Sequence, residues 1–244
     1  MNKPDYLKDN DWKLLKNKYK NLKPIIKKLN NNYPVQYLIG NVDFYGYPIE
    51  VKKGVLIPRF ETETLVEKTI DYLKKYKLTN TDVLEIGTGS GCIPITLKKE
   101  LPDLTITSID KSGKALRIAK RNIKKNKVDV TLIKKNVYNY RPINKYGLII
   151  SNPPYVREDE EVDPKTKYEP KIALYAKNEG LEYYEYIISH ANSMLQERFI
   201  IAFEIGAEQG SQIKKIAKKY FPKSKIKVEK DLASRDRYVF IINE

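Results

Sequence analysis

Apolar residues occur along this chain in two alternating patterns. Continuous apolar stretches at residues 82–86, 105–109 and 146–151 are typical of buried strands, because both faces of such a strand are covered. Stretches with apolar residues at every third or fourth position, such as 61–76 and 113–126, predict helices with one buried face. Strands that alternate with helices predict an α/β fold in which helices cover both faces of a mostly parallel sheet.

The alternation of predicted strands and helices continues toward the end of the chain. We expect four more strands, over residues 129–134, 199–205, 225–229 and 238–242, and three more helices, over residues 93–100, 181–195 and 208–220. The prediction is therefore a Rossmann-like, seven-stranded sheet within residues 59–244.

Two shorter regions come before this α/β domain. Residues 1–32 carry apolar residues at spacings of three or four among many Lys and Asn, which predicts a short helical segment. Residues 33–58 are punctuated by Gly and Pro and predict a β-hairpin linker, with short strands over 35–39, 42–45 and 49–51.

Composition narrows the classes of function. The chain is 41% hydrophobic and 32% charged, and no apolar run approaches the roughly 18 residues of a membrane helix. It starts without the apolar stretch of a secretory signal, so we expect a cytoplasmic protein with no membrane partner. Cys92 and His190 are the only residues of their kind, which argues against a disulfide, a metal site or a Ser-His-Asp triad.

The formal net charge of +15 suggests a nucleic-acid partner, because Lys and Arg side chains neutralise phosphates. However, only eight of the 46 basic residues are Arg, and the Lys residues are spread over predicted solvent-facing helix positions. We therefore expect surface charge that leaves nucleic-acid binding possible but not required.

A glycine-rich loop lies between the predicted strand 82–86 and the helix that follows. Its glycines run G-x-G-x-G, which does not match the G-x-G-x-x-G of dinucleotide sites, and no Walker Lys follows. A tight loop without a phosphate suits the amino-acid part of S-adenosylmethionine, although the loop alone could be a simple turn. The candidate ligands are Glu85, Gly87, Thr88, Gly89, Ser90 and Gly91.

The next two strand ends carry polar groups that suit the rest of this cofactor. Asp110 ends the second strand, where a carboxylate can accept both ribose hydroxyl protons, although Asp110 alone could be a helix N-cap. Asn136 and Val137 follow the third strand, at the place expected for adenine. The loop and Asp110 together favour S-adenosylmethionine as the cofactor, and Asn152, after the fourth strand, is a further candidate ligand of it.

The tetrapeptide Asn152, Pro153, Pro154 and Tyr155 follows the fourth strand. Two prolines cannot donate backbone hydrogen bonds, so the chain leaves the sheet here and exposes carbonyl groups. The Asn152 side-chain oxygen and the Pro153 carbonyl can accept the two protons of a planar N–H₂ group, with Tyr155 packed on the acceptor's flat face. This arrangement predicts methyl transfer to a planar nitrogen.

These motifs resemble those of the HemK family, the peptide chain release factor glutamine N5-methyltransferases. The resemblance covers roughly residues 34–243 and also rests on the segments at 34–40, 44–46, 56–63, 168–174 and 236–237. It implies a class I S-adenosylmethionine-dependent methyltransferase that acts on the glutamine of the Gly-Gly-Gln motif in class I release factors. We expect a monomer.

The resemblance also places Arg59, Glu61 and Glu63 close to the active site, although they could equally cap the following helix. The chain departs from the family pattern at Phe60, usually Pro, at Asn136, usually acidic, and at Val137, often aromatic. Its region before Pro34 is shorter than the family's N-terminal helical domain.

Two other functions compete with this interpretation. A nucleic-acid N-methyltransferase uses the same tetrapeptide on a flipped base, either at adenine N6 or at guanine N2. A cofactor-free partner of the translation machinery is the other alternative, but the presence of Asp110 and of the whole tetrapeptide argues against it.

Overall fold

The computed structural model describes residues 3–244 and contains one large sheet of seven strands in the order β5-β4-β3-β6-β7-β9-β8. The pairs from β5 to β7 are parallel, and β9 is antiparallel to both of its neighbours. This confirms the predicted fold class. The strands are β3 (Asp82–Ile86), β4 (Thr105–Asp110), β5 (Thr131–Lys134), β6 (Tyr146–Ser151), β7 (Leu195–Glu204), β8 (Lys225–Lys230) and β9 (Asp236–Asn243).

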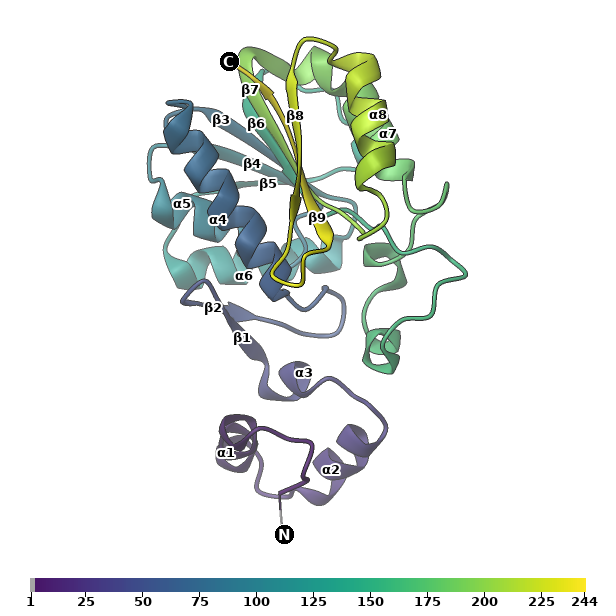
Figure 1. Ribbon diagram of the computed structural model, residues 1–244. Helices are drawn as coiled ribbons and strands as arrows, with labels where there is room; N and C mark the ends of the chain where they lie inside the picture. The colour runs from purple at the N-terminus through teal and green to yellow at the C-terminus, as the bar shows by residue number, and fades with distance from the viewer. Residues whose placement is uncertain (1–2) are drawn as a thin grey trace.

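Helices cover both faces of this sheet (Figure 1). One layer contains α4 (Phe60–Lys75), α5 (Cys92–Glu100) and α6 (Gly113–Asn126), and the other contains α7 (Glu182–Ala191) and α8 (Gly210–Tyr220). Short 3-10 turns also occur at η1 (Val137–Asn139), η2 (Pro164–Tyr168), η3 (Lys171–Ala173) and η4 (Asn192–Met194).

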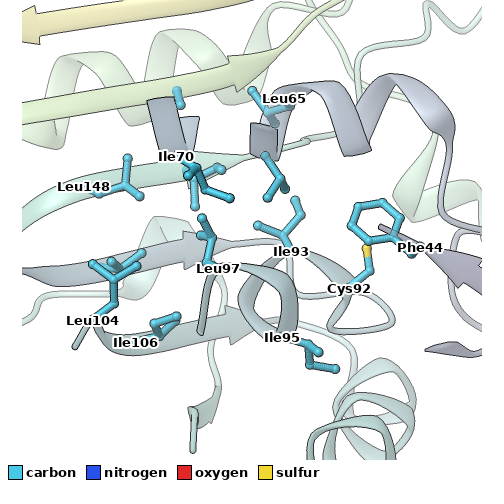
Figure 2. Close-up of a cluster of buried hydrophobic side chains, with 14 of the residues drawn as sticks. Phe44, Leu65, Ile70, Cys92, Ile93, Ile95, Leu97, Leu104, Ile106 and Leu148 are labelled. Carbon is cyan, nitrogen blue, oxygen red and sulfur yellow. The ribbon is translucent and has the colours of Figure 1, made fainter. Parts of the chain in front are cut away.

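The core lies in two layers because side chains of buried strands alternate between the faces of a sheet. On the α4 and α5 side, Leu65 and Leu97 pack with Ile106 and Leu148 from the sheet (Figure 2). Each fully buried aliphatic side chain of this kind stabilises the fold by about 1.5–3 kcal/mol. The core therefore holds the strand ends, where the candidate motifs lie, in fixed positions.

The N-terminal region forms a small unit of its own. Helices α1 (Asp9–Lys18), α2 (Lys23–Asn30) and α3 (Val35–Ile39) enclose an apolar cluster around Trp12 and Leu15. The hairpin of β1 (Asn41–Phe44) and β2 (Tyr47–Glu50) lies between these helices and the α/β domain (Figure 1). Phe44 is fully buried in the main core, so the hairpin is packed against the domain.

The expectation of a strand over residues 35–39 is wrong, because these residues form the helix α3. Pro34 precedes the helix with a φ of −57°, and Gly40 ends it in the left-handed conformation, with φ of 95°. Its buried side chains pack mainly against α1 and α2, so a local β-branched composition was overridden by tertiary packing.

The predicted helix over 181–195 also ends earlier than expected. α7 stops at Ala191, η4 follows, and Leu195 already pairs with Tyr146 as the first residue of β7. Apolar Met194 and Leu195 fit a helix face as well as a strand, and only the neighbouring strand β6 decides between them. Among residues 3–244, no helix has both the length and the apolar character needed to cross a membrane.

Candidate active site

A cavity opens at the carboxyl ends of β3, β4 and β6, which is where ligands bind in open α/β sheets. The loop after β3 and the tetrapeptide after β6 start side by side from paired strand ends, and both line the cavity. Segments from outside the sheet close its sides. Those outer walls come from Gly54–Leu56, Pro58, Thr62, Lys135–Val137, Pro170, Ile172, Ala173 and Tyr183.

The glycine loop turns tightly because its three glycines have positive φ angles: 86° at Gly87, 55° at Gly89 and 83° at Gly91. Gly87 and Gly89 line the cavity, and so do Thr88 and Ser90. A Cβ atom at Gly91 would lie 3.2 Å from the Cβ of Ala119 on α6, so glycine at position 91 allows α6 to pack closely against the loop. Gly91 does not line the cavity.

Two buried polar side chains, Glu85 near the end of β3 and Thr88 in the loop, lack partners within residues 3–244. Neither the two carboxyl oxygens of Glu85 nor the hydroxyl of Thr88 makes a hydrogen bond there. Burial raises the pKa of Glu85 to about 8. Glu85 lies beneath the cavity and does not line it, whereas Thr88 does. An unsatisfied hydroxyl in a cavity wall, such as that of Thr88, is available to a bound ligand.

Asp110 holds the loop and still has acceptor capacity to spare. Its Oδ2 accepts the amide proton of Gly89 at 2.9 Å, and its Oδ1 accepts that of Ser112 at 2.7 Å. Each carboxylate oxygen has two lone pairs, so one on each remains for a ligand's hydroxyl group. Burial raises the pKa of Asp110, and the Gly89 and Ser112 amides oppose this shift.

Asn136 and Val137 lie on the far side of Asp110 and both line the cavity. The Asn136 side-chain oxygen accepts the amide proton of Tyr138 at 3.3 Å, which caps η1 and leaves the amide N–H₂ group as a donor. Val137 is buried and presents an apolar surface together with Ile109 and Ala115. An apolar slot with one polar edge suits a purine ring.

The tetrapeptide contributes three residues to the cavity: Asn152, Pro153 and Pro154. The side-chain Nδ2 of Asn152 donates to Thr62 Oγ1 at 3.0 Å, so its Oδ1 remains available as an acceptor. Within residues 3–244, no backbone or side-chain group donates to the Pro153 carbonyl. Asn152 and Pro153 thus offer acceptors in the cavity that Asp110 also lines.

Tyr155 does not line the cavity. Its hydroxyl donates to Glu204 Oε1 at 3.4 Å, its backbone carbonyl accepts from Gln209, and its ring packs next to Gly206. Glu204 ends β7 and is only 1% exposed. Burial raises the pKa of Glu204 to about 7. The stacking of Tyr155 on a bound acceptor therefore stays a prediction.

Arg59 joins two segments that flank the cavity. Its guanidinium donates to Glu169 Oε1 at 2.6 Å, and Glu169 Oε2 accepts the amide proton of Ile57 at 3.1 Å. Glu61 and Glu63 lie in the first turn of α4, where the helix dipole favours acidic groups, but no side chain caps this helix. None of Arg59, Glu61 and Glu63 lines the cavity.

Several residues of the site were not singled out from the sequence. Thr62 lines the cavity and contacts Asn152, and Glu204 contacts Thr62. Glu169 anchors the wall at Pro170, and Tyr183 comes from α7. An acidic residue at the end of a buried strand is the signal that identified Asp110, and Glu204 carries the same signal. Within residues 3–244, no group of three or more His, Cys, Asp or Glu side chains could hold a metal ion.

Comparison with known proteins identifies the family. Residues 62–169 match the methyltransferase small domain. The chain is 39% identical over 220 residues to the release factor glutamine methyltransferase of Enterococcus faecalis, covering 88% of this chain and 78% of that protein. It is 40% identical to the protein of the same name from Streptococcus pneumoniae, covering 89% and 77%.

A solved structure supports the same relation. The protein-(glutamine-N5) methyltransferase (release factor-specific) of Alicyclobacillus acidocaldarius is 25% identical, with a TM-score of 0.50, and the alignment covers 77% of this chain and 94% of that one. The two relatives are 39% and 40% identical to this chain over 78% and 77% of their own length, which identifies the family. The chain belongs to the family of release factor glutamine methyltransferases.

Proposed function

We propose that this enzyme transfers a methyl group from S-adenosylmethionine to the side-chain amide nitrogen, N5, of the glutamine in the Gly-Gly-Gln motif of a class I release factor. One observation carries the proposal: the acceptors of Asn152 and Pro153 lie in the same cavity as the glycine loop and Asp110. Donor and acceptor of the methyl group would therefore meet in one place. The names of the relatives support the substrate.

The cavity fits S-adenosylmethionine in three respects. The unpartnered Thr88 hydroxyl lines the cavity and suits the charged amino-acid end, and the free lone pairs of Asp110 suit ribose hydroxyls. The slot at Asn136 and Val137 suits adenine. When bound, this cofactor supplies a methyl group on a positively charged sulfur, which makes the methyl carbon electrophilic.

The protein's own contribution is to position the glutamine side chain. A carboxamide nitrogen is a weak nucleophile because its lone pair is delocalised into the carbonyl group. If Asn152 Oδ1 and the Pro153 carbonyl accept hydrogen bonds from its two N–H groups, one face of the nitrogen is held toward the methyl carbon. Such positioning contributes up to roughly 7–11 kcal/mol in favourable models.

The same two acceptors stabilise the positive charge that develops on nitrogen during transfer. This stabilisation is larger in the transition state than in the ground state, so it accelerates the chemical step itself. The N-methylated carboxamide is strongly acidic while it carries both protons, and it releases one of them to water. Asn152 and Pro153 can therefore act without a dedicated general base beside the nitrogen.

The test is to incubate the protein with labelled S-adenosylmethionine and a purified release factor, alongside a variant of that factor with Ala in place of the Gly-Gly-Gln glutamine. Label is expected on the first and not on the second. Transfer to DNA or RNA fragments added in parallel, with none to the release factor, would instead favour the nucleic-acid base as acceptor.

We also propose that the enzyme acts as a monomer in the cytoplasm, since release factors act during translation. Sedimentation of the purified protein tests the first part, and a concentration-dependent dimer would contradict it.

A further inference from the structure

Thr62, in the wall of the cavity, connects three distant parts of the chain through its hydroxyl group. It lies in the first turn of α4 and is only 3% exposed. Its hydroxyl oxygen is 3.0 Å from Nδ2 of Asn152, which follows β6, and 2.6 Å from Oε2 of Glu204, which ends β7. The three side chains form a continuous chain of hydrogen bonds.

The direction of this chain follows from its last member. An ionised carboxylate only accepts hydrogen bonds, so Thr62 must donate its single hydroxyl proton to Glu204. The Thr62 hydroxyl oxygen then presents lone pairs to Asn152 and accepts a hydrogen bond from Asn152 Nδ2. If the Asn152 amide were flipped, its oxygen would face the Thr62 lone pairs without a proton between them.

The surroundings of Glu204 favour its acceptor role. Its second oxygen, Oε1, accepts from the Tyr155 hydroxyl at 3.4 Å. Burial raises the pKa of Glu204 to about 7, while its bond to Thr62 and the positive charge of Arg237 oppose this shift. Arg237 is held by Asp231 and by the Ile205 carbonyl. Above pH 8, Glu204 is therefore mostly ionised.

We propose that Thr62 and Glu204 are positioning residues that fix the orientation of the Asn152 carboxamide, so that its oxygen, and not its N–H₂ group, faces the acceptor nitrogen. The inference rests on the proposed function, because the orientation matters only if Asn152 Oδ1 accepts a hydrogen bond from the N–H₂ group of the substrate. A flipped amide would set two donors against each other and misplace the glutamine.

A pair of substitutions at Thr62 separates the hydroxyl group from the shape of the side chain. Thr62→Val keeps the shape and removes the hydroxyl, whereas Thr62→Ser keeps the hydroxyl and removes a methyl group. Initial rates of release factor methylation would be measured at pH 8.5 over a range of S-adenosylmethionine concentrations. Calorimetry would give the cofactor's dissociation constant.

The expected result is a fall in kcat of about 10²-fold for Thr62→Val, because misorientation of one group has effects of that size. Thr62→Ser should stay within about threefold of the unsubstituted protein, and cofactor affinity should change by less than about twofold in both. An undiminished kcat in Thr62→Val, or an equal fall in Thr62→Ser, would overturn the proposal.

A second variant covers the case in which Thr62→Val is poorly folded, as judged by circular dichroism. Glu204→Gln keeps the shape of the carboxylate but introduces a donor, so the chain of hydrogen bonds loses its fixed direction. We expect kcat to fall at least about tenfold with cofactor affinity retained, and an unchanged kcat would overturn the proposal. If the unsubstituted enzyme itself left release factors unlabelled, the proposed function would fail instead.

Discussion

We propose that individual residues at the carboxyl edge of the sheet bind two different ligands. Asp110 has its oxygens partly used by the Gly89 and Ser112 amides, which holds the carboxylate rigidly. Asn152 has its amide nitrogen used by Thr62, which leaves its oxygen as an acceptor. Substitution of either residue should therefore affect one ligand and spare the other.

Asn152→Ala is expected to lower kcat for release factor methylation by about 10²–10³-fold, because it removes an acceptor that interacts with the developing positive charge. The dissociation constant for S-adenosylmethionine, measured by calorimetry, should stay within about twofold. Asn144→Ala, on an exposed loop, serves as the control. An equal loss of methylation and cofactor binding would contradict the assignment.

Asp110→Ala is expected to weaken S-adenosylmethionine binding at least about tenfold, since hydrogen bonds to a charged group each contribute about 1.5–3 kcal/mol. The substitution also frees the Gly89 amide and loosens the glycine loop. Asp103→Ala replaces an exposed acid and should bind the cofactor normally. A dissociation constant unaffected by Asp110→Ala would show that the ribose lies elsewhere.

At the scale of elements, the cavity is completed by segments that the sheet does not hold. Residues 170–173 form one wall, and they are fastened to the start of α4 through Glu169. The Glu169 side chain is 2% exposed, while the Arg59 side chain that pairs with it is 35% exposed. The ion pair therefore links residues 170–173 to the start of α4, at the edge of the core.

Arg59→Met should lower the free energy of unfolding by about 1–3 kcal/mol, because Glu169 would remain buried without its partner, although solvent reaches the pair and reduces the effect. Urea denaturation measures this difference. Arg157→Met provides a matched control, since the Arg157–Asp159 pair is exposed and long at 3.7 Å. Equal stability of both variants would show that the Arg59–Glu169 ion pair contributes nothing to the free energy of unfolding.

At the scale of the whole molecule, stability depends on buried acids as well as on the apolar core. Glu85 and Glu204 are each 1% exposed, at the ends of central strands. Their pKa values are raised to about 8 and about 7 by burial. Both groups therefore bind protons in the folded protein at pH values where the unfolded chain has released them.

Because folding raises these pKa values, the associated stability is fully present below about pH 4.5 and is lost as pH rises to about 8. The free energy of unfolding should therefore decrease from pH 5.5 to pH 8.5, by at most about 1.4 kcal/mol per pH unit for each group. Urea denaturation at the two pH values measures the change. Glu85→Gln should show a smaller decrease, and an equal one would exclude Glu85 as a source.

The sequence by itself determined the sheet, the position of the glycine loop and the acidic end of β4, because these depend on local periodicity and on strand ends. It did not determine the helix at Val35–Ile39, whose conformation depends on packing against α1 and α2. It also left open whether Arg59 lies in the active site or caps α4, and the structure pairs it with Glu169 instead.

Only the tertiary structure decided how Asn152 is oriented. The tetrapeptide predicts an acceptor from its residue types, but an amide has a donor and an acceptor end of nearly the same shape. Thr62 and Glu204, which lie 142 residues apart in the chain, distinguish the two ends by hydrogen bonding. Such a contact has no local signal in the sequence, because it exists only once β6, β7 and α4 have packed together.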